Sequence, residues 1–559
     1  AKSWGPTVER QLDGLTIPVT RIGLSDLLES KVDWSLVNWR APQTILPTTG
    51  KKVLRNHQVE ALTKVREGLA SRDRGQLIMA CGTGKTFTAL KIAEELATEG
   101  KAHATTVLVL VPSIQLLNQT LREWKQESEI PFRAFAVCSD TKVGKGTEDL
   151  AVHDLIYPAT TDAKVLAREV RARSEHDQFT VVFSTYQSVD QVAAAQRAGM
   201  PRFDLVICDE AHRTTGVTLA GDDESNFVRV HDDGFLGADK RLYMTATPRL
   251  FDPNVRERAK ANDAVLASMD DEGVFGPVLH RLGFGEAVER GLLTDYKVLV
   301  LTVDEGVVSS GFQQELSTHK ELTLSDASRL IGCWNGLAKR FAREDGDGLA
   351  GLGLSPMRRA VAFAPSIKAS KLVEAAYPAL VDRLRAGADT HRSLGIEVRH
   401  VDGTMNALER GNHLQWLKDG ATVAEDADPV CRLLTNARCL SEGVDVPALD
   451  AVVFLSPRGS QVDVVQSVGR VMRKDPAGVK QVGYVVLPVV IPAGVRPEDA
   501  LDDNERFRVV WQVLQALRAH DDRFAAMVNK LDLNRRKDER ILVFDTTGRP
   551  IGKRAKQEH

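Results

Sequence analysis

Cysteine is scarce in this chain. Only 6 of its 559 residues are cysteines, and no two of them form a Cys-x-x-Cys pair. A disulfide-stabilised scaffold needs a much higher cysteine density, and a zinc ribbon needs closely paired thiols, so the sequence fits neither class. We expect reduced, mostly buried thiols and a cytoplasmic location.

An excess of charge of one sign and long apolar runs are also missing. The formal net charge is −3, from 73 Lys and Arg against 76 Asp and Glu, so any nucleic-acid site must be a local basic patch. The best uncharged run, Gln481–Gly494, is broken by Pro488 and Pro492 and is shorter than the ~20 apolar residues of a membrane span. The first residues show no signal-peptide pattern.

What the chain does have is a globular composition, 43% hydrophobic and 27% charged, which excludes wholesale disorder. Short apolar runs alternate with segments of helical period, and this alternation is typical of parallel sheets covered by helices on both faces. The runs are Leu77–Met79, Val107–Val111, Val181–Phe183, Leu205–Cys208, Val361–Phe363 and Val452–Leu455.

The apolar runs fall into two series, before and after Tyr296, which predicts an α/β fold with two tandem parallel-sheet domains. The predicted organisation is a lead-in or linker at residues 1–50, a first domain at 51–295, a second at 296–496 and a helical segment at 497–559. The helical pattern of the last segment runs from Val509 to Leu517.

The strongest motif is Met79-Ala-Cys-Gly-Thr-Gly-Lys-Thr86, between an apolar strand and a helix. Gly82 and Gly84 allow backbone shapes in which successive N–H groups surround phosphate oxygens. Lys85 brings a charge to the β and γ phosphates of ATP, and the Thr86 hydroxyl can hold Mg²⁺. Met79 stands where the usual pattern has a glycine. The alternative, an ordinary Gly-rich turn, does not account for the Lys-Thr pair.

A second motif, Phe203–His212, is an apolar strand that ends in two acids. We assign Asp209 to the Mg²⁺ ion and Glu210 to the base that orients the attacking water. His212 is interpreted as a coupling residue that bridges to a neighbouring loop. The alternative, a solvated turn, would fit these acids if no phosphate loop preceded them.

Asp209-Glu-Ala-His212, together with the phosphate loop, resembles the DEAH-type superfamily 2 helicases and translocases. The resemblance implies two RecA-like domains with ATP in the cleft between them. Leu54-Arg-Asn-His-Gln58 is similar to the adenine-reading motif of that superfamily. Gln58 is then the base reader, because an amide can both donate to and accept from adenine.

The second series of strands contains stretches that resemble the later motifs: Ala360–Ser366, His400–Gly403, Thr435–Asp445 and Gln466–Arg473. The resemblance implies that Arg470 and Arg473 are arginine fingers directed at the γ-phosphate, a role that suits the planar, always charged guanidinium. A surface helix with salt bridges is the alternative for this pair taken alone.

The residue sequences in and around several motifs are more specific than the superfamily pattern. They resemble the motor region of single-chain type ISP restriction-modification enzymes. The stretches are Met79–Thr86, Val111–Leu117, Ala136–Asp140, Asp209–Gly216, Tyr243–Pro248, Leu282–Val288 and Asp295–Val298. This resemblance implies an ATP-driven translocase on double-stranded DNA. It also implies nuclease, methyltransferase and target-recognition domains in a longer parent chain.

The sequence departs from that architecture in several places. It has no Asn-Pro-Pro-Tyr methyltransferase motif, and the E-x-K triplets at Glu29 and Glu123 lack the setting of a nuclease site. The chain also begins with Ala1 rather than Met. We therefore expect no nuclease or methyltransferase site here, and we expect a fragment of a longer protein or a stand-alone relative.

The resemblance assigns the remaining roles residue by residue. The catalytic residues are Lys85, Asp209, Glu210, Gln466, Arg470 and Arg473, and the ATP-binding residues are Arg55, Gln58, Gly82, Thr83, Gly84, Lys85, Thr86, Gly443 and Asp445. Thr86 and Asp209 hold Mg²⁺, and His212, Thr245 and Thr247 couple the ATP site to nucleic acid. The backbone of the nucleic acid contacts Pro112, Ser113, Ser184, Thr185, Ser366 and Thr435.

Two other functions stay open at this point. One is a stand-alone repair or RNA-remodelling helicase that separates strands. The other is an ATP-gated nucleic-acid clamp that does not translocate. The choice of DNA over RNA depends on the family resemblance alone.

Overall fold

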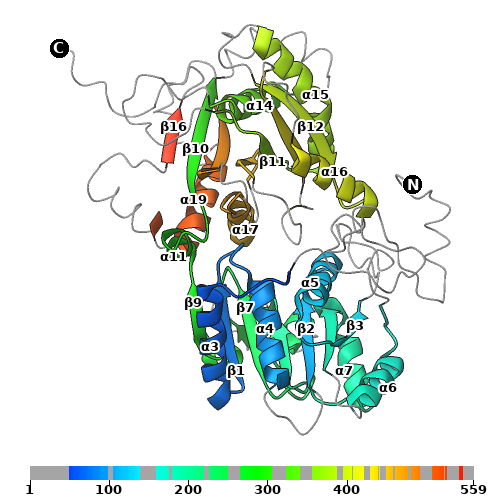
Figure 1. Cartoon of the computed structure of the whole chain (residues 1–559). Coiled ribbons are helices and arrows are strands. Elements are labelled where there is room, and N and C mark those ends of the chain that lie inside the picture. Colours follow the sequence, from blue (N-terminus) through cyan, green and yellow to red (C-terminus); the bar gives the residue numbers. More distant parts are fainter. Residues whose placement is uncertain are drawn as a thin grey trace, which may run out of the picture. The chain divides into compact units, whose positions relative to one another are not determined.

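In the computed structural model the chain forms two compact units (Figure 1). Unit 1 comprises residues 1–283 and 406–409, and unit 2 comprises 284–405 and 410–559. The structure describes residues 50–98, 105–138, 159–174, 179–218, 226–249, 265–304, 323–339, 355–386, 394–405, 407–420, 428–437, 440, 449–457, 460–475, 480–491, 507–521, 523–524 and 541–544. Apart from Gly50, the predicted lead-in lies outside these residues.

Unit 1 contains a seven-stranded sheet in which every pair is parallel. In spatial order the strands are β3 (Arg133–Val137), β4 (Thr180–Thr185), β2 (Thr106–Val111), β5 (Leu205–Cys208), β7 (Arg241–Thr245), β1 (Arg74–Met79) and β9 (Val278–Leu282). A separate antiparallel pair is formed by β6 (Gly216–Thr218) and β8 (Val265–Ala267).

Helices cover both faces of this sheet because its strands are apolar on both sides. Val182 of β4 belongs to a core cluster with α6 (Ala163–Ser174) and α7 (Val189–Arg197). The next residue, Phe183, contacts Trp124 of α5 on the opposite face, with ring centroids 5.5 Å apart, as the alternation along a strand requires. The helices on that face are α3 (Asn56–Ser71), α4 (Lys85–Thr98) and α5 (Ile114–Glu127).

Unit 2 contains a second seven-stranded sheet, also parallel throughout. Its order is β12 (Gly395–Val401), β13 (Val430–Asn436), β11 (Arg359–Phe363), β14 (Ala451–Phe454), β15 (Val482–Ile491), β10 (Asp295–Asp304) and β16 (Ile541–Phe544). The helices are α11 (Phe284–Glu289), α14 (Leu324–Leu337), α15 (Ile367–Ala386), α16 (Ala407–Asp419), α17 (Gln461–Val471) and α19 (Arg508–His520).

The predicted fold class, two parallel-sheet α/β domains, is confirmed. The compact units divide after Gly283, whereas the sequence placed the boundary after Asp295, because α11 packs with unit 2. The predicted C-terminal helix is present as α19, but β16 extends the second sheet beyond the predicted end of the domain at residue 496. None of the helices among the described residues is long and apolar enough to cross a membrane.

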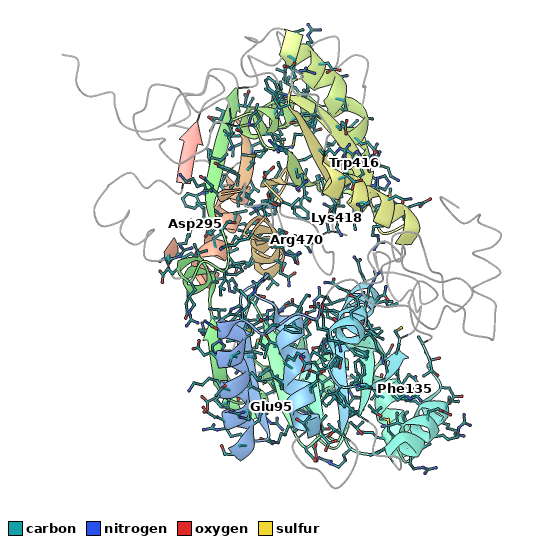
Figure 2. All side chains as sticks on the ribbon, viewed as in Figure 1. Glu95, Phe135, Asp295, Trp416, Lys418 and Arg470 are labelled. Carbon is teal, nitrogen blue, oxygen red and sulfur yellow. The ribbon has the colours of Figure 1, made fainter. Side chains whose placement is uncertain are left out.

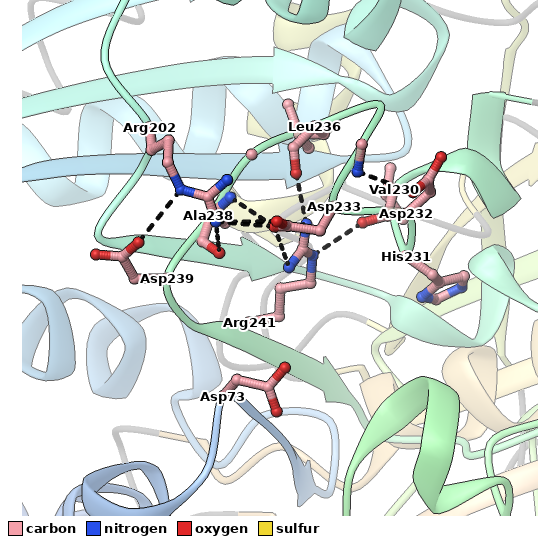
Figure 3. A network of polar contacts seen from close by, with 12 residues as sticks. Asp73, Arg202, Val230, His231, Asp232, Asp233, Leu236, Ala238, Asp239 and Arg241 are labelled. Atoms are coloured by element: carbon pink, nitrogen blue, oxygen red, sulfur yellow. Dashed lines mark hydrogen bonds and ion pairs between the residues drawn. The ribbon is translucent and has the colours of Figure 1, made fainter.

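A polar network at the amino-terminal ends of the strands of unit 1 is built on Arg241, the first residue of β7 (Figure 3). Arg241 is 1% exposed, and its guanidinium donates to the carbonyl oxygens of Val230 and Leu236 and to the Asp233 carboxylate. Arg202 binds Asp233 from the solvent side at 3.0 Å. A buried charge needs such partners, so this network joins the loop over residues 230–239 to β7.

The pKa of Asp233 is lowered. Burial would raise it, but the N–H of Ala238 and the guanidinium groups of Arg202 and Arg241 outweigh that effect. Because the folded pKa lies below the ordinary value of an aspartate, 3.8, the stabilisation by this carboxylate is fully present above that pH. It is lost as the pH falls through the lower folded value.

We predict that Arg241→Met lowers the free energy of unfolding of unit 1 by about 2–4 kcal/mol, because buried carbonyl groups lose charged donors. The matched control Arg202→Met, which removes a guanidinium that is about half exposed, should cost less than about 1 kcal/mol. Urea denaturation measures both. Equal losses would contradict the assignment of Arg241 as the centre of the network.

Candidate active site

Three of the predicted motifs lie at the carboxyl ends of neighbouring strands in unit 1. The phosphate loop follows β1, the two acids follow β5, and Thr245 ends β7. Strand β7 pairs with both β5 and β1. Because all these strands are parallel, the three motifs lie together at one edge of the sheet, where open α/β sheets bind their ligands.

The phosphate loop has the backbone that the sequence predicts. Gly82 and Gly84 have φ angles of +83° and +90°, a region that favours glycine. Helix α4 begins at Lys85, so the N–H groups at its amino terminus open onto the loop. Lys85 Nζ donates to the carbonyl oxygen of Met79 at 3.3 Å. Met79 itself is a buried residue of β1, which explains why a non-glycine residue is tolerated there.

The first turn of α3 is hydrogen-bonded to this loop. Gln58 accepts from the N–H of Arg55 at 2.9 Å and donates from Nε2 to the carbonyl oxygen of Gly84 at 3.3 Å. A Cβ atom on Gly84 would lie 2.4 Å from Gln58 Nε2, so a side chain there would displace this amide. The predicted base reader therefore also holds the phosphate loop.

Two further side chains, which the sequence did not predict, hold the loop. The ring nitrogen Nε2 of His57 lies 2.9 Å from the carbonyl oxygen of Thr83 and must carry the proton, because a carbonyl only accepts. Trp124 Nε1 donates to the carbonyl oxygen of Thr86 at 3.1 Å. Both bonds reach main-chain atoms, so the only signal in the sequence is the position of His57 beside Gln58.

The two acids after β5 have different environments. Asp209 is 5% exposed and accepts the N–H of Glu210 at 2.9 Å. Glu210 has φ +49° and ψ +46°, a left-handed conformation that is unfavourable for a residue with a side chain. Its Oε2 is buried, lies 3.4 Å from His212 Nδ1 and has no hydrogen-bond partner among the described residues. A carboxylate on a strained backbone, with one oxygen that makes no hydrogen bond within the described residues, fits a catalytic role.

The three predicted coupling residues come together. His212 Nδ1 lies 3.0 Å from Thr245 Oγ1 and 3.4 Å from Thr247 Oγ1, and Thr245 Oγ1 also accepts the N–H of Thr247. These contacts join the short 3₁₀ helix after the acids, η5 (Ala211–Thr214), to the turn that follows β7.

A second bridge, which links η5 to strand β7 itself, was not predicted. His231 Nε2 lies 3.0 Å from the carbonyl oxygen of Thr214, and Nδ1 lies 2.9 Å from the Tyr243 hydroxyl. Burial lowers the pKa of His231 to about 4, so the ring is neutral. The proton is then on Nε2, and Tyr243 donates to Nδ1.

The residues present fit a nucleotide with Mg²⁺. The left-handed backbone at Gly82 and Gly84 suits a loop whose N–H groups surround phosphate oxygens, and the Thr86 hydroxyl and Asp209 carboxylate are oxygen ligands of the type that Mg²⁺ prefers. Bound there, the ion would neutralise charge on the phosphate oxygens.

The strand-end residues predicted to grip nucleic acid in unit 1 use their polar groups within the protein. Ser113 caps α5 by accepting the N–H of Leu116. The Ser184 hydroxyl donates to the carbonyl oxygen of Thr185, and the Thr185 hydroxyl donates to Ser188. Pro112, Ser184 and Thr185 are buried, and only Ser113 of this set is partly exposed.

In unit 2, Ser366 is exposed and caps α15 by accepting the N–H of Ala369. Thr435, in contrast, is fully buried, and its hydroxyl lies 3.0 Å from that of Ser370. Ser370 in turn contacts His400, whose other ring nitrogen lies 2.9 Å from Asp402. The Thr435 side chain therefore faces an internal network. Gly443 and Asp445 lie outside the described residues.

Helix α17 carries the remaining predicted catalytic residues, and Figure 2 marks Arg470 on it. Gln466 and Arg470 are 6% and 7% exposed, and Arg473 follows the helix, half-buried. Neither the Oε1 nor the Nε2 atom of Gln466 has a hydrogen-bond partner in the described part of the chain. A buried amide without partners calls for an explanation, such as a ligand.

Comparison with known families gives two matches. Residues 51–250 match the family described as "Type III restriction enzyme, res subunit", and residues 352–475 match "Helicase conserved C-terminal domain". A protein of African swine fever virus named "Probable helicase A859L" is 27% identical over 478 residues, which is 84% of this chain and 44% of that protein.

Two solved structures are also similar. The first is "ATP-dependent Type ISP restriction-modification enzyme LlaBIII bound to DNA", with a TM-score of 0.83 and 41% identity, covering 98% of this chain and 34% of that one. The second is a nuclease-deletion mutant of the type ISP enzyme LlaGI in complex with a DNA substrate mimic, with a TM-score of 0.59 and 35% identity, covering 88% and 30%. The chain thus spans about a third of these enzymes and less than half of the viral relative.

The two family matches and the similarity to LlaBIII over nearly the whole chain lead to one conclusion. This chain belongs to the superfamily 2 helicases and is similar to the motor region of type ISP restriction-modification enzymes.

Proposed function

We propose that this chain is an ATP-hydrolysing motor that translocates along double-stranded DNA as the motor segment of a type ISP restriction-modification enzyme. The observation that carries the proposal is the 41% identity with DNA-bound LlaBIII over 98% of this chain. The chain would act in the cytoplasm in defence against phage DNA. The parent protein would supply nuclease, methyltransferase and target-recognition domains.

In this proposal unit 1 binds ATP. The N–H groups of Gly82, Thr83 and Gly84 and the ammonium of Lys85 would bind the phosphates. Arg55 and Gln58 would bind the adenosine end. The contact between Gln58 and the Gly84 carbonyl supports this role, because it places the amide beside the phosphate loop.

Thr86 and Asp209 would hold Mg²⁺, and Glu210 would accept a proton from the attacking water. Support for the role of Glu210 comes from its buried Oε2, which no described donor occupies. His212 would transmit conformational changes at this site to Thr245 and Thr247, since it contacts both hydroxyl groups.

Unit 2 would contribute Gln466, Arg470 and Arg473 on the γ-phosphate side, and Gly443 and Asp445 on the ribose side. A guanidinium is suited to neutralising the charge that develops during phosphoryl transfer. ATP contacted by both units would favour one arrangement of the two, and hydrolysis would remove that preference.

The motor would hold DNA chiefly through phosphates, which carry no sequence information, so its binding would be nonspecific and salt-sensitive. Ser113 and Ser366 are the exposed or partly exposed members of the proposed contact set. At Pro112, Ser184, Thr185 and Thr435, whose side chains are buried, the main chain is the better candidate for the contact.

We predict that Glu210→Gln lowers the kcat of DNA-stimulated ATP hydrolysis by roughly 10²-fold or more, because the amide cannot take up a proton. Lys85→Ala should abolish activity through loss of phosphate binding. The control Lys64→Ala changes an exposed lysine of α3 and should have no effect. ATPase activity that survives in both site variants would rule out the proposed motor.

Gln58→Glu tests the proposed contact with adenine. The substitution keeps the acceptor for the Arg55 N–H and removes the donor, so KM for ATP should rise roughly 3–10-fold, the value of one lost hydrogen bond. KM for GTP, whose base offers a different pattern of donors and acceptors, should change less. A parallel rise for both nucleotides would show that Gln58 only supports the phosphate loop.

Two DNA assays distinguish translocation from strand separation. A translocase on duplex DNA should displace a triplex-forming strand when ATP is supplied and should leave a forked duplex paired. Unwinding of the fork would favour a stand-alone helicase instead. ATP-dependent binding without either activity would indicate a clamp.

A further inference from the structure

The carboxyl end of α17 is tied to the sheet of unit 2. The last carbonyl groups of a helix have no partner within the helix and must be satisfied from outside it. Here the helix ends at Val471, and the carbonyl groups of Val471, Met472 and Arg473 all accept bonds from side chains or N–H groups of other segments.

Thr294, directly before β10, makes the first of these ties. Its N–H and its hydroxyl both donate to the carbonyl oxygen of Met472, at 2.8 and 2.9 Å. Two donors from one residue on one acceptor determine both the position and the direction of that carbonyl group.

Lys480, just before β15, makes the second tie. Its ammonium donates to the carbonyl oxygens of Val471 and Arg473, the latter at 3.1 Å. A cation at this point also interacts favourably with the negative end of the helix dipole. The same side chain thus spans the turn that joins α17 to Arg473.

Gly483 of β15 supplies the third feature, which is steric. A Cβ atom at this position would lie 2.3 Å from the carbonyl oxygen of Val471 and 2.9 Å from its carbonyl carbon. These are backbone atoms, which cannot move aside as the end of a flexible side chain can. The absence of a side chain therefore lets the helix end rest directly on the strand.

We propose that Thr294, Lys480 and Gly483 are positioning residues for ATP hydrolysis, which fix the last turn of α17 and thereby aim Arg470 and Arg473. The inference rests on the proposed role of these arginines as fingers. Strands β10 and β15 pair over ten residues each, so the helix end is held by the longest paired strands of the sheet. Misplacement of a catalytic group by 1 Å can cost about 10²-fold in rate, so even a small release should matter.

The charge of Lys480 makes this arrangement sensitive to pH. Burial lowers its pKa to about 8, with Asp450 and Asp475 acting to raise it and Arg473 to lower it. Above that pH the amine keeps N–H donors but loses its positive charge, so its hold on the two carbonyl groups weakens. The wild-type kcat should therefore fall on the alkaline side, near pH 8.

The test compares Lys480→Met, which keeps the apolar stem, with Lys480→Arg, which keeps the charge at every accessible pH. Lys480→Met should lower kcat of DNA-stimulated ATP hydrolysis roughly 10–100-fold, with KM for ATP changed less than about twofold. Lys480→Arg should restore most of kcat and shift the alkaline fall to higher pH. The control Lys474→Met removes an exposed neighbouring lysine and should leave both constants unchanged.

Amide hydrogen exchange and Arg470→Ala complete the test. Lys480→Met should speed exchange over residues 471–474 while leaving the sheet protected, which locates the effect at the helix end. If Arg470→Ala abolishes ATPase activity and Lys480→Met does not reduce it, the positioning role is wrong and the motor proposal stands. If Arg470→Ala leaves ATPase activity intact, the finger role itself is wrong, and the inference about Lys480 is overturned with it.

Discussion

Parallel strand pairing is the constraint on which the rest of this structure depends. In both units every strand of the main sheet runs in the same direction, and helices bury the faces. Polar chemistry is therefore confined to the two edges where strands begin or end. In unit 1 the edges have separate tasks: the carboxyl edge gathers the phosphate loop, the acids and Thr245, while the amino edge carries the network around Arg241.

The fold and the ATP motifs could be predicted because short contiguous stretches of sequence determine both. An apolar run followed by Gly82–Thr86 or by Asp209 and Glu210 specifies a strand, a turn and its chemistry within ten residues. The boundary between the units was harder to place. Residues 284–294 follow the last strand of one sheet and precede the first strand of the other, and only packing decides to which they belong. Strand β16 is short and far from its partner β10 in sequence, so no local pattern marked it.

Side-chain direction limited the prediction of the site. Thr185 and Thr435 lie at or next to the ends of strands where the family pattern expects contact with nucleic acid, yet their hydroxyl groups point into the protein. His57, Trp124 and His231 were missed for a related reason. Each binds a main-chain carbonyl group. Every residue has such a group, so the type of the partner residue gives no signal in the sequence.

The backbone of Glu210 has a consequence for how this fold is maintained. A left-handed residue with a side chain costs about 1–2 kcal/mol relative to glycine or asparagine in the same conformation. Two surrounding hydrogen bonds must offset that cost: the Glu210 N–H donates to Asp209 Oδ1, and the Arg213 N–H donates to the Glu210 carbonyl oxygen. Position 210 is thus a point where thermodynamic preference and chemistry select different amino acids. A procedure that optimised this chain for stability alone would favour replacing this carboxylate.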